Sequence, residues 1–187
     1  MESNGYGESV KTIIARIHLE EKEGVKRPQE PLEKIPINPV DPWIIKNAKD
    51  VGINIDGYTH EISNYFIRHV MKTHGNEKTE LDRGNIPIND TDFEKIPEII
   101  ENPDYVVFGG KRNGIEKIIY VKYAEKGTAL YFEEILTGMK NKSLRGNTLY
   151  KTRKPLDKDG LLKNIRGAGK TDLSNAKITS PGGGHPT

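Results

Sequence analysis

Two histidines in the stretch "IRHVMKTHG", residues 67–75, are the clearest candidates for proton-transfer chemistry. His69 and His74 lie five positions apart, and Gly75 follows. Imidazole is the side chain whose ordinary pKa lies closest to neutral pH, so it can accept or donate a proton there. The spacing of the surrounding apolar residues predicts a helix over residues 60–75 that ends at the glycine.

The predicted helix places the two imidazole rings in different environments. His69 falls within the apolar stripe, so we expect it to be half-buried. His74 lies in the last turn, where unpaired carbonyls favour an imidazolium and the ring can face solvent, so it is the better general acid or base. A spacing of five turns the rings about 140° apart. Because the chain also lacks cysteine and an HExxH motif, we expect neither a metal site nor a cofactor.

Hydroxyl groups and cations lie on the predicted strands. Alternation along residues 147–153 places Thr148, Tyr150 and Thr152 on one face. Such a row can bind a phosphate or simply form a solvated sheet face. Lys122, on another predicted strand, can pair with a carboxylate such as Glu134 or present its charge to a phosphate.

Composition indicates one domain of ordinary size with extensions. The 187 residues are 34% hydrophobic and 30% charged, with no cysteine, which excludes disulfides and a cysteine nucleophile. The net charge is +2, but residues 138–170 hold ten basic and two acidic residues. Such a run is typical of a surface that binds a polyanion, or of a tail that is simply exposed to solvent. No signal peptide and no apolar run of about 18 residues is present, so we expect a soluble protein.

The order of predicted elements is helices first, then strands. Helices are expected over residues 8–23, 41–52, 60–75 and 89–104, the last interrupted at Pro97, with a proline-rich linker or wrapped arm over 27–42. Four strands follow, over 105–110, 115–124, 128–138 and 147–153, joined by hairpin turns. The pattern predicts an α+β fold in which helices cover one face of an antiparallel sheet of about four strands and the other face is open. We expect three parts: an N-terminal helical and proline-rich extension (1–42), a main folded domain (43–155) and a basic, flexible C-terminal tail (156–187).

An imidazole, cations and hydroxyls suit one reaction well. In RNA transesterification the substrate's own 2′-hydroxyl attacks the adjacent phosphorus, so the protein needs only a base, an acid and positive charge on the phosphate. DNA lacks that nucleophile, and its cleavage usually recruits a metal.

The segment "GYTHEISNYFIRHVMKTHGNEKTELDRGNIPINDTDFEKIPEIIENPD", with the later "YVKY", "YFEEILTG" and "NTLYKT", resembles the phage-borne branch of the barnase, EndoU, colicin and RelE-like ribonucleases. The resemblance runs from about Gly57 to Thr152. The family pattern falls on Tyr58, His60, Arg68, His69, His74, Gly75, Glu80, Arg83, Gly84, Asp92, Phe93, Pro103, Asp104, Lys122, Glu134, Thr148, Tyr150 and Lys151.

The resemblance implies helices on a small antiparallel sheet and metal-independent, toxin-like cleavage of RNA to a cyclic phosphate. The residues expected to be catalytic are His74, Lys122, Thr148, Tyr150 and His69, the last orienting its neighbours. Those expected to bind substrate are Arg68, Arg83, Lys151 and Glu134.

The resemblance also bears on partners and location. The expected partners are RNA, with tRNA as one candidate, and either an immunity protein or phage structural proteins, with no membrane. The expected site of action is the bacterial cytoplasm, reached as an effector or with a phage particle. The alternative is a non-catalytic phage head protein, or a nucleic-acid-binding module, that retains the fold.

Overall fold

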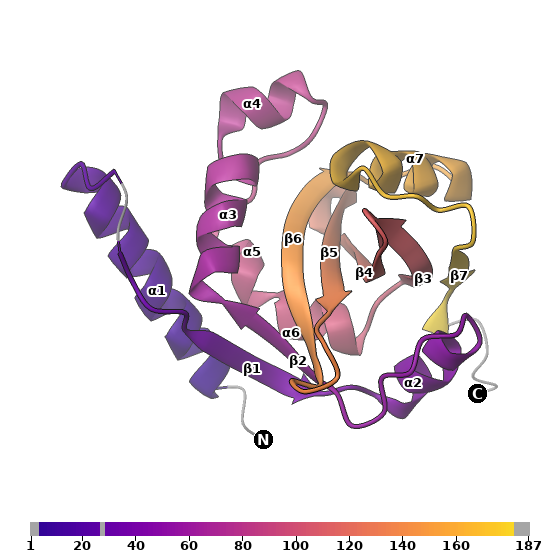
Figure 1. Cartoon of the computed structure of the whole chain (residues 1–187). Helices are drawn as coiled ribbons and strands as arrows, with labels where there is room; N and C mark the ends of the chain where they lie inside the picture. Colours follow the sequence, from indigo (N-terminus) through magenta and orange to yellow (C-terminus); the bar gives the residue numbers. More distant parts are fainter. Residues whose placement is uncertain (1–3, 27–28, 182–187) are drawn as a thin grey trace.

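A computed structural model describes residues 4–26 and 29–181 of the chain. Figure 1 shows helices gathered around a curved central sheet. The helices are α1 (Asn4–Lys22), α2 (Pro42–Lys49), α3 (Asn64–His74), α4 (Glu77–Asp82), α5 (Asp90–Glu94), α6 (Ile96–Glu101) and α7 (Lys158–Gly169), with a short 3₁₀ turn at Glu125–Gly127. The strands are β1 (Lys34–Pro39), β2 (Thr59–Ser63), β3 (Tyr105–Arg112), β4 (Ile115–Ala124), β5 (Thr128–Leu136), β6 (Ser143–Arg153) and β7 (Lys177–Thr179).

The sheet confirms the α+β class but is larger than expected. Its seven strands run in the order β1-β2-β6-β5-β4-β3-β7, and every neighbouring pair is antiparallel except β2 and β6. The four predicted strands are β3 to β6, at its centre. The expected linker over 27–42 contains β1, whose two prolines are tolerated because the strand lies at the sheet edge.

The predicted helix over residues 60–75 is in fact a strand followed by a helix. Residues 59–63 form β2, and the side chain of Ser63 accepts a hydrogen bond from the backbone N–H of Phe66, which caps α3. Gly75 ends the helix as expected. The interruption at Pro97 is confirmed as well, because α5 and α6 are two separate short helices.

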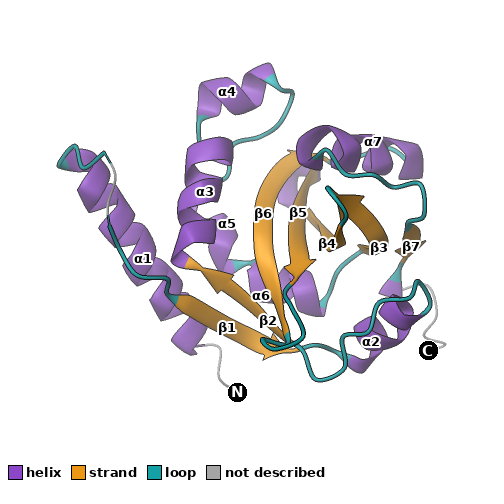
Figure 2. Cartoon of the chain, viewed as in Figure 1, coloured by secondary structure: helices purple, strands orange, loops and turns teal. Residues whose placement is uncertain are grey.

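Both faces of the sheet carry a hydrophobic core, so the expected open face is wrong. On the first face, side chains of β3 to β6 pack with the helices α1, α2, α3, α5 and α6. On the second face, Leu161 and Ile165 of α7 pack on Tyr131 and Tyr150. Figure 2 shows α7 lying across the strands, where the sequence pattern predicted only a tail.

The two ends of the described chain are part of this packing. Ile13 and Ile17 of α1 are buried in the first core, and β7 adds a strand next to β3. The division into extension, domain and tail stays a prediction. Among the described residues, no helix combines the length and the apolar character needed to cross a membrane.

Candidate active site

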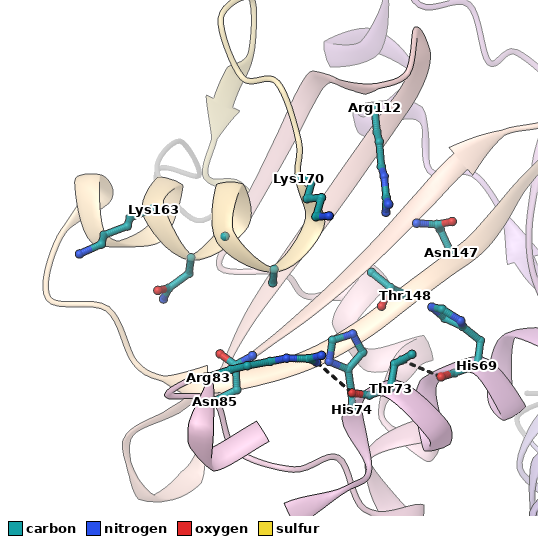
Figure 3. A pocket seen from close by; sticks show the side chains of 13 residues that line it. His69, Thr73, His74, Arg83, Asn85, Arg112, Asn147, Thr148, Lys163 and Lys170 are labelled. Atoms are coloured by element: carbon teal, nitrogen blue, oxygen red, sulfur yellow. Dashed lines mark hydrogen bonds between the residues drawn. The ribbon is translucent and has the colours of Figure 1, made fainter. Parts of the chain in front are cut away.

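The end of α3 forms one wall of a cavity of about 710 Å³. The opposite wall comes from α7, and the bulged part of β6 and the tip of the β3–β4 hairpin complete it (Figure 3). The lining residues are His69, Thr73, His74, Arg83, Asn85, Arg112, Asn147, Thr148, Lys163, Asn164, Gly167, Ala168 and Lys170. Four of the nine residues predicted to be functional meet here: His69, His74, Arg83 and Thr148.

His74 is held by a buried carboxylate. Its Nδ1 atom lies 3.0 Å from Oε2 of Glu80, a residue of α4 that is 0% exposed. Glu80 also accepts hydrogen bonds from Arg83, at 2.8 Å, and from Asn85, at 3.2 Å. Because a carboxylate can only accept, it fixes the proton of His74 on Nδ1 and leaves Nε2 for a substrate. The expectation of an exposed His74 is wrong, since the ring is buried with 7% of its surface accessible.

His69 is the exposed member of the pair, although we expected it to be half-buried. It precedes His74 by five positions on α3, and Figure 3 shows both rings near Thr148. Neighbouring protein atoms partly desolvate the ring, and the positive charges of His74, Arg112 and Lys72 add to this, so the pKa of His69 lies below its ordinary value. A lowered pKa keeps the ring neutral at pH 7, the form that accepts a proton.

A β-bulge in β6 directs two successive side chains into the cavity. Glu133 of β5 pairs with Thr148, but Glu134 pairs with Gly146, so Asn147 is an extra residue in β6. The bulge breaks the alternation of the strand, which is why both Asn147 and Thr148 line the cavity. The Thr148 hydroxyl is buried and has no hydrogen-bond partner among the described residues. Its hydrogen-bonding capacity is therefore not used by the described protein groups.

The cavity is positively charged. Arg83, Arg112, Lys163 and Lys170 line it together with the two histidines, and none of the described lining residues carries a carboxyl group. Arg83 is partly neutralised by Glu80 and also donates to the carbonyl of Thr73, at 3.2 Å. The other three cations form no ion pair among the described residues. Such a lining favours an anionic ligand.

Tyr150 contributes to the site through its ring and not through its hydroxyl. The ring lies 5.9 Å from the ring of His74, measured between centroids, and stacks on Tyr131 at 4.8 Å. The hydroxyl donates to Oε2 of Glu133 at 2.8 Å, and complete burial raises the pKa of Tyr150 well above its ordinary value. The hydroxyl is thus hydrogen-bonded within the second core, beneath the cavity.

Lys122 and Glu134 lie on the opposite face of the sheet from Tyr150. Lys122 follows Ile118 and Tyr120 of the first core in the alternation of β4, and its Nζ donates to the carbonyl of Asn102 at 2.7 Å. Glu134 does not pair with it. Both carboxylate oxygens of Glu134 face Nδ1 of His60, at 2.8 and 3.0 Å, and both residues are buried. Burial raises the pKa of Glu134, although the positive charge of His60 acts against this.

Arg68 and Lys151 are also not brought to the cavity. Arg68 pairs with Glu20 of α1 and with Glu30, which ties the N-terminal helix to α3. Lys151 donates to Asp92 at 2.6 Å, and Asp92 in turn completes the capping box of α5. The family pattern therefore contains two sets of residues, one that lines the cavity and one that holds the elements around it.

Several cavity residues were not predicted from the sequence. Arg112 was read as part of a hairpin turn, and Lys163 and Lys170 as part of a tail. The excess of basic residues between 138 and 170 was the available signal for the lysines, since α7 brings them to the cavity. No feature of the sequence marked Asn147, because its side chain reaches the cavity only as a result of the bulge in β6.

Among the described residues, no group of three or more His, Cys, Asp or Glu side chains is placed to hold a metal ion. No curated protein and no solved structure matches the chain significantly. A family model does match, over residues 40–159, which is more than half of the chain; its description is "phage-Barnase-EndoU-ColicinE5/D-RelE like nuclease3". The match contains α3, the histidines and the bulged strand, and the chain therefore belongs to this family of nucleases.

Proposed function

We propose that the protein is a metal-independent endoribonuclease that cleaves RNA by attack of the 2′-hydroxyl on the neighbouring phosphodiester. The observation that carries this proposal is the arrangement of two histidines and an unpartnered hydroxyl in a cavity with four cations and no carboxylate among its described lining residues. A phosphodiester is the anion that such a lining suits, and the family match supports nuclease chemistry.

The histidines divide the two proton transfers. His69, kept neutral by its lowered pKa, accepts the proton of the attacking 2′-hydroxyl. His74 donates a proton from Nε2 to the 5′-oxygen that leaves, which breaks the phosphorus–oxygen bond and yields a 2′,3′-cyclic phosphate. The buried carboxylate of Glu80 stabilises the positive charge that His74 carries before this step.

The phosphate is held by Thr148, Arg83 and Arg112. The Thr148 hydroxyl donates to a non-bridging oxygen, and the two guanidinium groups stabilise the negative charge that grows in the transition state. Arg83 occupies a fixed place because Glu80 and the Thr73 carbonyl both accept from its Nη1. Lys122, Tyr150, Lys151, Arg68 and Glu134 position the surrounding structure.

Incubation of the protein with bacterial RNA in excess EDTA tests this proposal. We expect RNA fragments that end in a cyclic phosphate, and a loss of roughly 10²-fold or more in the rate for His74→Gln. The control is His18→Gln, because His18 lies on α1, outside the lining, and pairs with Asp90. A folded His74→Gln protein that cleaves at the parental rate would refute the role given to this histidine.

A further inference from the structure

The α7 side of the cavity lies outside the part of the chain that the nuclease family describes. The family match ends at residue 159, and α7 continues to Gly169. We use the name α7 wall for the residues Lys163, Asn164 and Lys170, which line the cavity opposite α3. The residues of this wall thus lie beyond the matched region of the chain.

The lysines of the α7 wall are free to bind an anion. Neither Lys163 nor Lys170 forms an ion pair among the described residues, unlike Lys151 and Arg68. Figure 3 shows Lys170 and Arg112 reaching toward the cavity on the side away from Arg83. The cations near His74 and those of the α7 wall are therefore spread over a cavity of about 710 Å³, a volume that holds a ligand much larger than one phosphate.

Lys170 is held in an uncommon backbone conformation. It caps α7 with φ 47° and ψ 44°, in the left-handed region that favours glycine. The next residue, Thr171, is buried, and its hydroxyl lies 3.3 Å from Nζ of the buried Lys117. The end of α7 is thus anchored next to the cavity, which holds Lys170 at its edge.

We propose that the α7 wall is a second phosphate-binding subsite, which holds a phosphate of the RNA strand next to the one being cleaved. The inference rests on the proposed function and adds a substrate class to it. The preferred substrate is a single-stranded oligonucleotide with phosphates on both sides of the cleavage point, and a dinucleotide, with only one phosphate, cannot reach the subsite.

Lys163→Ala and Lys170→Gly test the subsite. Glycine adopts the left-handed conformation without strain, so Lys170→Gly removes the charge while the backbone is kept. Arg166→Ala is the matched control, because Arg166 is an exposed cation on the same helix that does not line the cavity. Circular dichroism and thermal melting check that each variant is folded, and Lys170→Gln provides a second replacement.

Two measurements separate the subsite from the chemistry. Binding of an uncleavable, 2′-O-methylated octanucleotide is measured by fluorescence anisotropy at several salt concentrations. We expect each lysine variant to weaken binding by about tenfold, a loss typical of one charge-assisted hydrogen bond, and to reduce the slope of log K against log salt by about 0.7. For cleavage, the ratio of kcat/KM for an octanucleotide to that for a dinucleotide should fall by about tenfold.

The outcomes are distinct. Octanucleotide binding that is unchanged in both lysine variants would overturn the subsite, as would an equal loss in Arg166→Ala or an equal loss of kcat/KM for both substrate lengths. A wild-type protein that binds the octanucleotide through these lysines but cleaves no RNA would refute the proposed function while supporting the subsite.

Discussion

At the scale of single residues, the proposed chemistry depends most on the pair of His74 and Glu80. Glu80 is buried and accepts hydrogen bonds from three side chains, His74, Arg83 and Asn85. One carboxylate therefore orients both the group proposed to transfer a proton, His74, and a group proposed to bind the phosphate, Arg83. It does not itself line the cavity, so its effect on the reaction passes through those side chains.

Replacement of Glu80 by glutamine tests this positioning role. Glutamine keeps the size of the side chain, but its neutral amide no longer stabilises a charged His74. We expect kcat to fall by roughly 10²-fold while KM changes little, because the loss affects proton transfer more than binding. A kcat that is restored in Glu80→Asp would support the view that Glu80 positions His74. A roughly 10²-fold rise in KM with no change in kcat would contradict it.

Under the proposed mechanism, the protonation of His69 sets the acid side of the pH dependence of cleavage. Because its pKa lies below the ordinary value, the ring is neutral at pH 7 and gains a proton only as the pH falls through that lowered pKa. We expect kcat/KM to be high at neutral pH and to decline on the acid side, with this decline absent from the residual activity of His69→Gln. An acid limb that persists unchanged in that variant would assign it to another group.

At the scale of elements, the bulge in β6 and the helix α4 bring the cavity residues together. The bulge turns Asn147 and Thr148 toward the cavity, and α4 supplies Glu80 and leads into Arg83. On the other face, the buried pair of His60 and Glu134 joins β2 to β5 within the first core. That pair links the parallel strand β2 to the centre of the sheet.

His60→Ala should be strongly destabilising. It leaves the carboxylate of Glu134 buried without its partner, which typically costs about 3–5 kcal/mol. Urea denaturation measures the change in the free energy of unfolding. In His60→Ala the burial that raises the pKa of Glu134 is no longer opposed by His60, so we expect the loss to be smaller at low pH, where the carboxyl is protonated. A change below about 1 kcal/mol would show that the pair is not structurally important.

The elements with a strong local pattern were predictable from the sequence, and those formed through distant contacts were not. Strands β3 to β6 are runs rich in β-branched and aromatic residues, and the turns that precede β4 and β5 contain a glycine, Gly114 and Gly127. In contrast, β2 continues into α3 without a break in the apolar pattern, and β1 contains prolines. Helix α7 contains three glycines, at positions 160, 167 and 169, which mask its helical pattern.

The same reasoning applies to the candidate site. The histidines, Arg83 and Thr148 were predictable because their residue types and the family pattern mark them. The burial of His74 was not, because it depends on α4 folding back over the end of α3. Lys122 and Lys151 had the right chemistry, but the fold places them on the other face, next to Asn102 and Asp92.

At the scale of the whole molecule, the N-terminal helix shares a core with the nuclease family region. Val10, Ile13, Ile14 and Ile17 of α1 are buried in the same cluster as Phe66, Phe93 and Phe132. Ion pairs from Arg68 to Glu20 and Glu30 lie at the same boundary. The predicted extension is thus packed against the helices that carry the site.

Ile13→Ala tests whether α1 is part of one folding unit. Ile13 is fully buried, and truncation of such a side chain typically costs about 2–5 kcal/mol. We expect a single unfolding transition, followed by fluorescence of Trp43, that shifts to lower denaturant in the variant. Two separate transitions, with only the first affected, would show that the N-terminal helix unfolds on its own.

The proposed reaction requires the 2′-hydroxyl of the substrate as the attacking group, and a DNA oligonucleotide that contains a single ribonucleotide isolates that requirement. In excess EDTA, we predict one cut, directly 3′ of the ribose, a product that ends in a 2′,3′-cyclic phosphate, and no cleavage when that ribose is 2′-O-methylated. Cleavage of the methylated oligonucleotide, or activity that appears only when a divalent metal ion is added, would contradict the account.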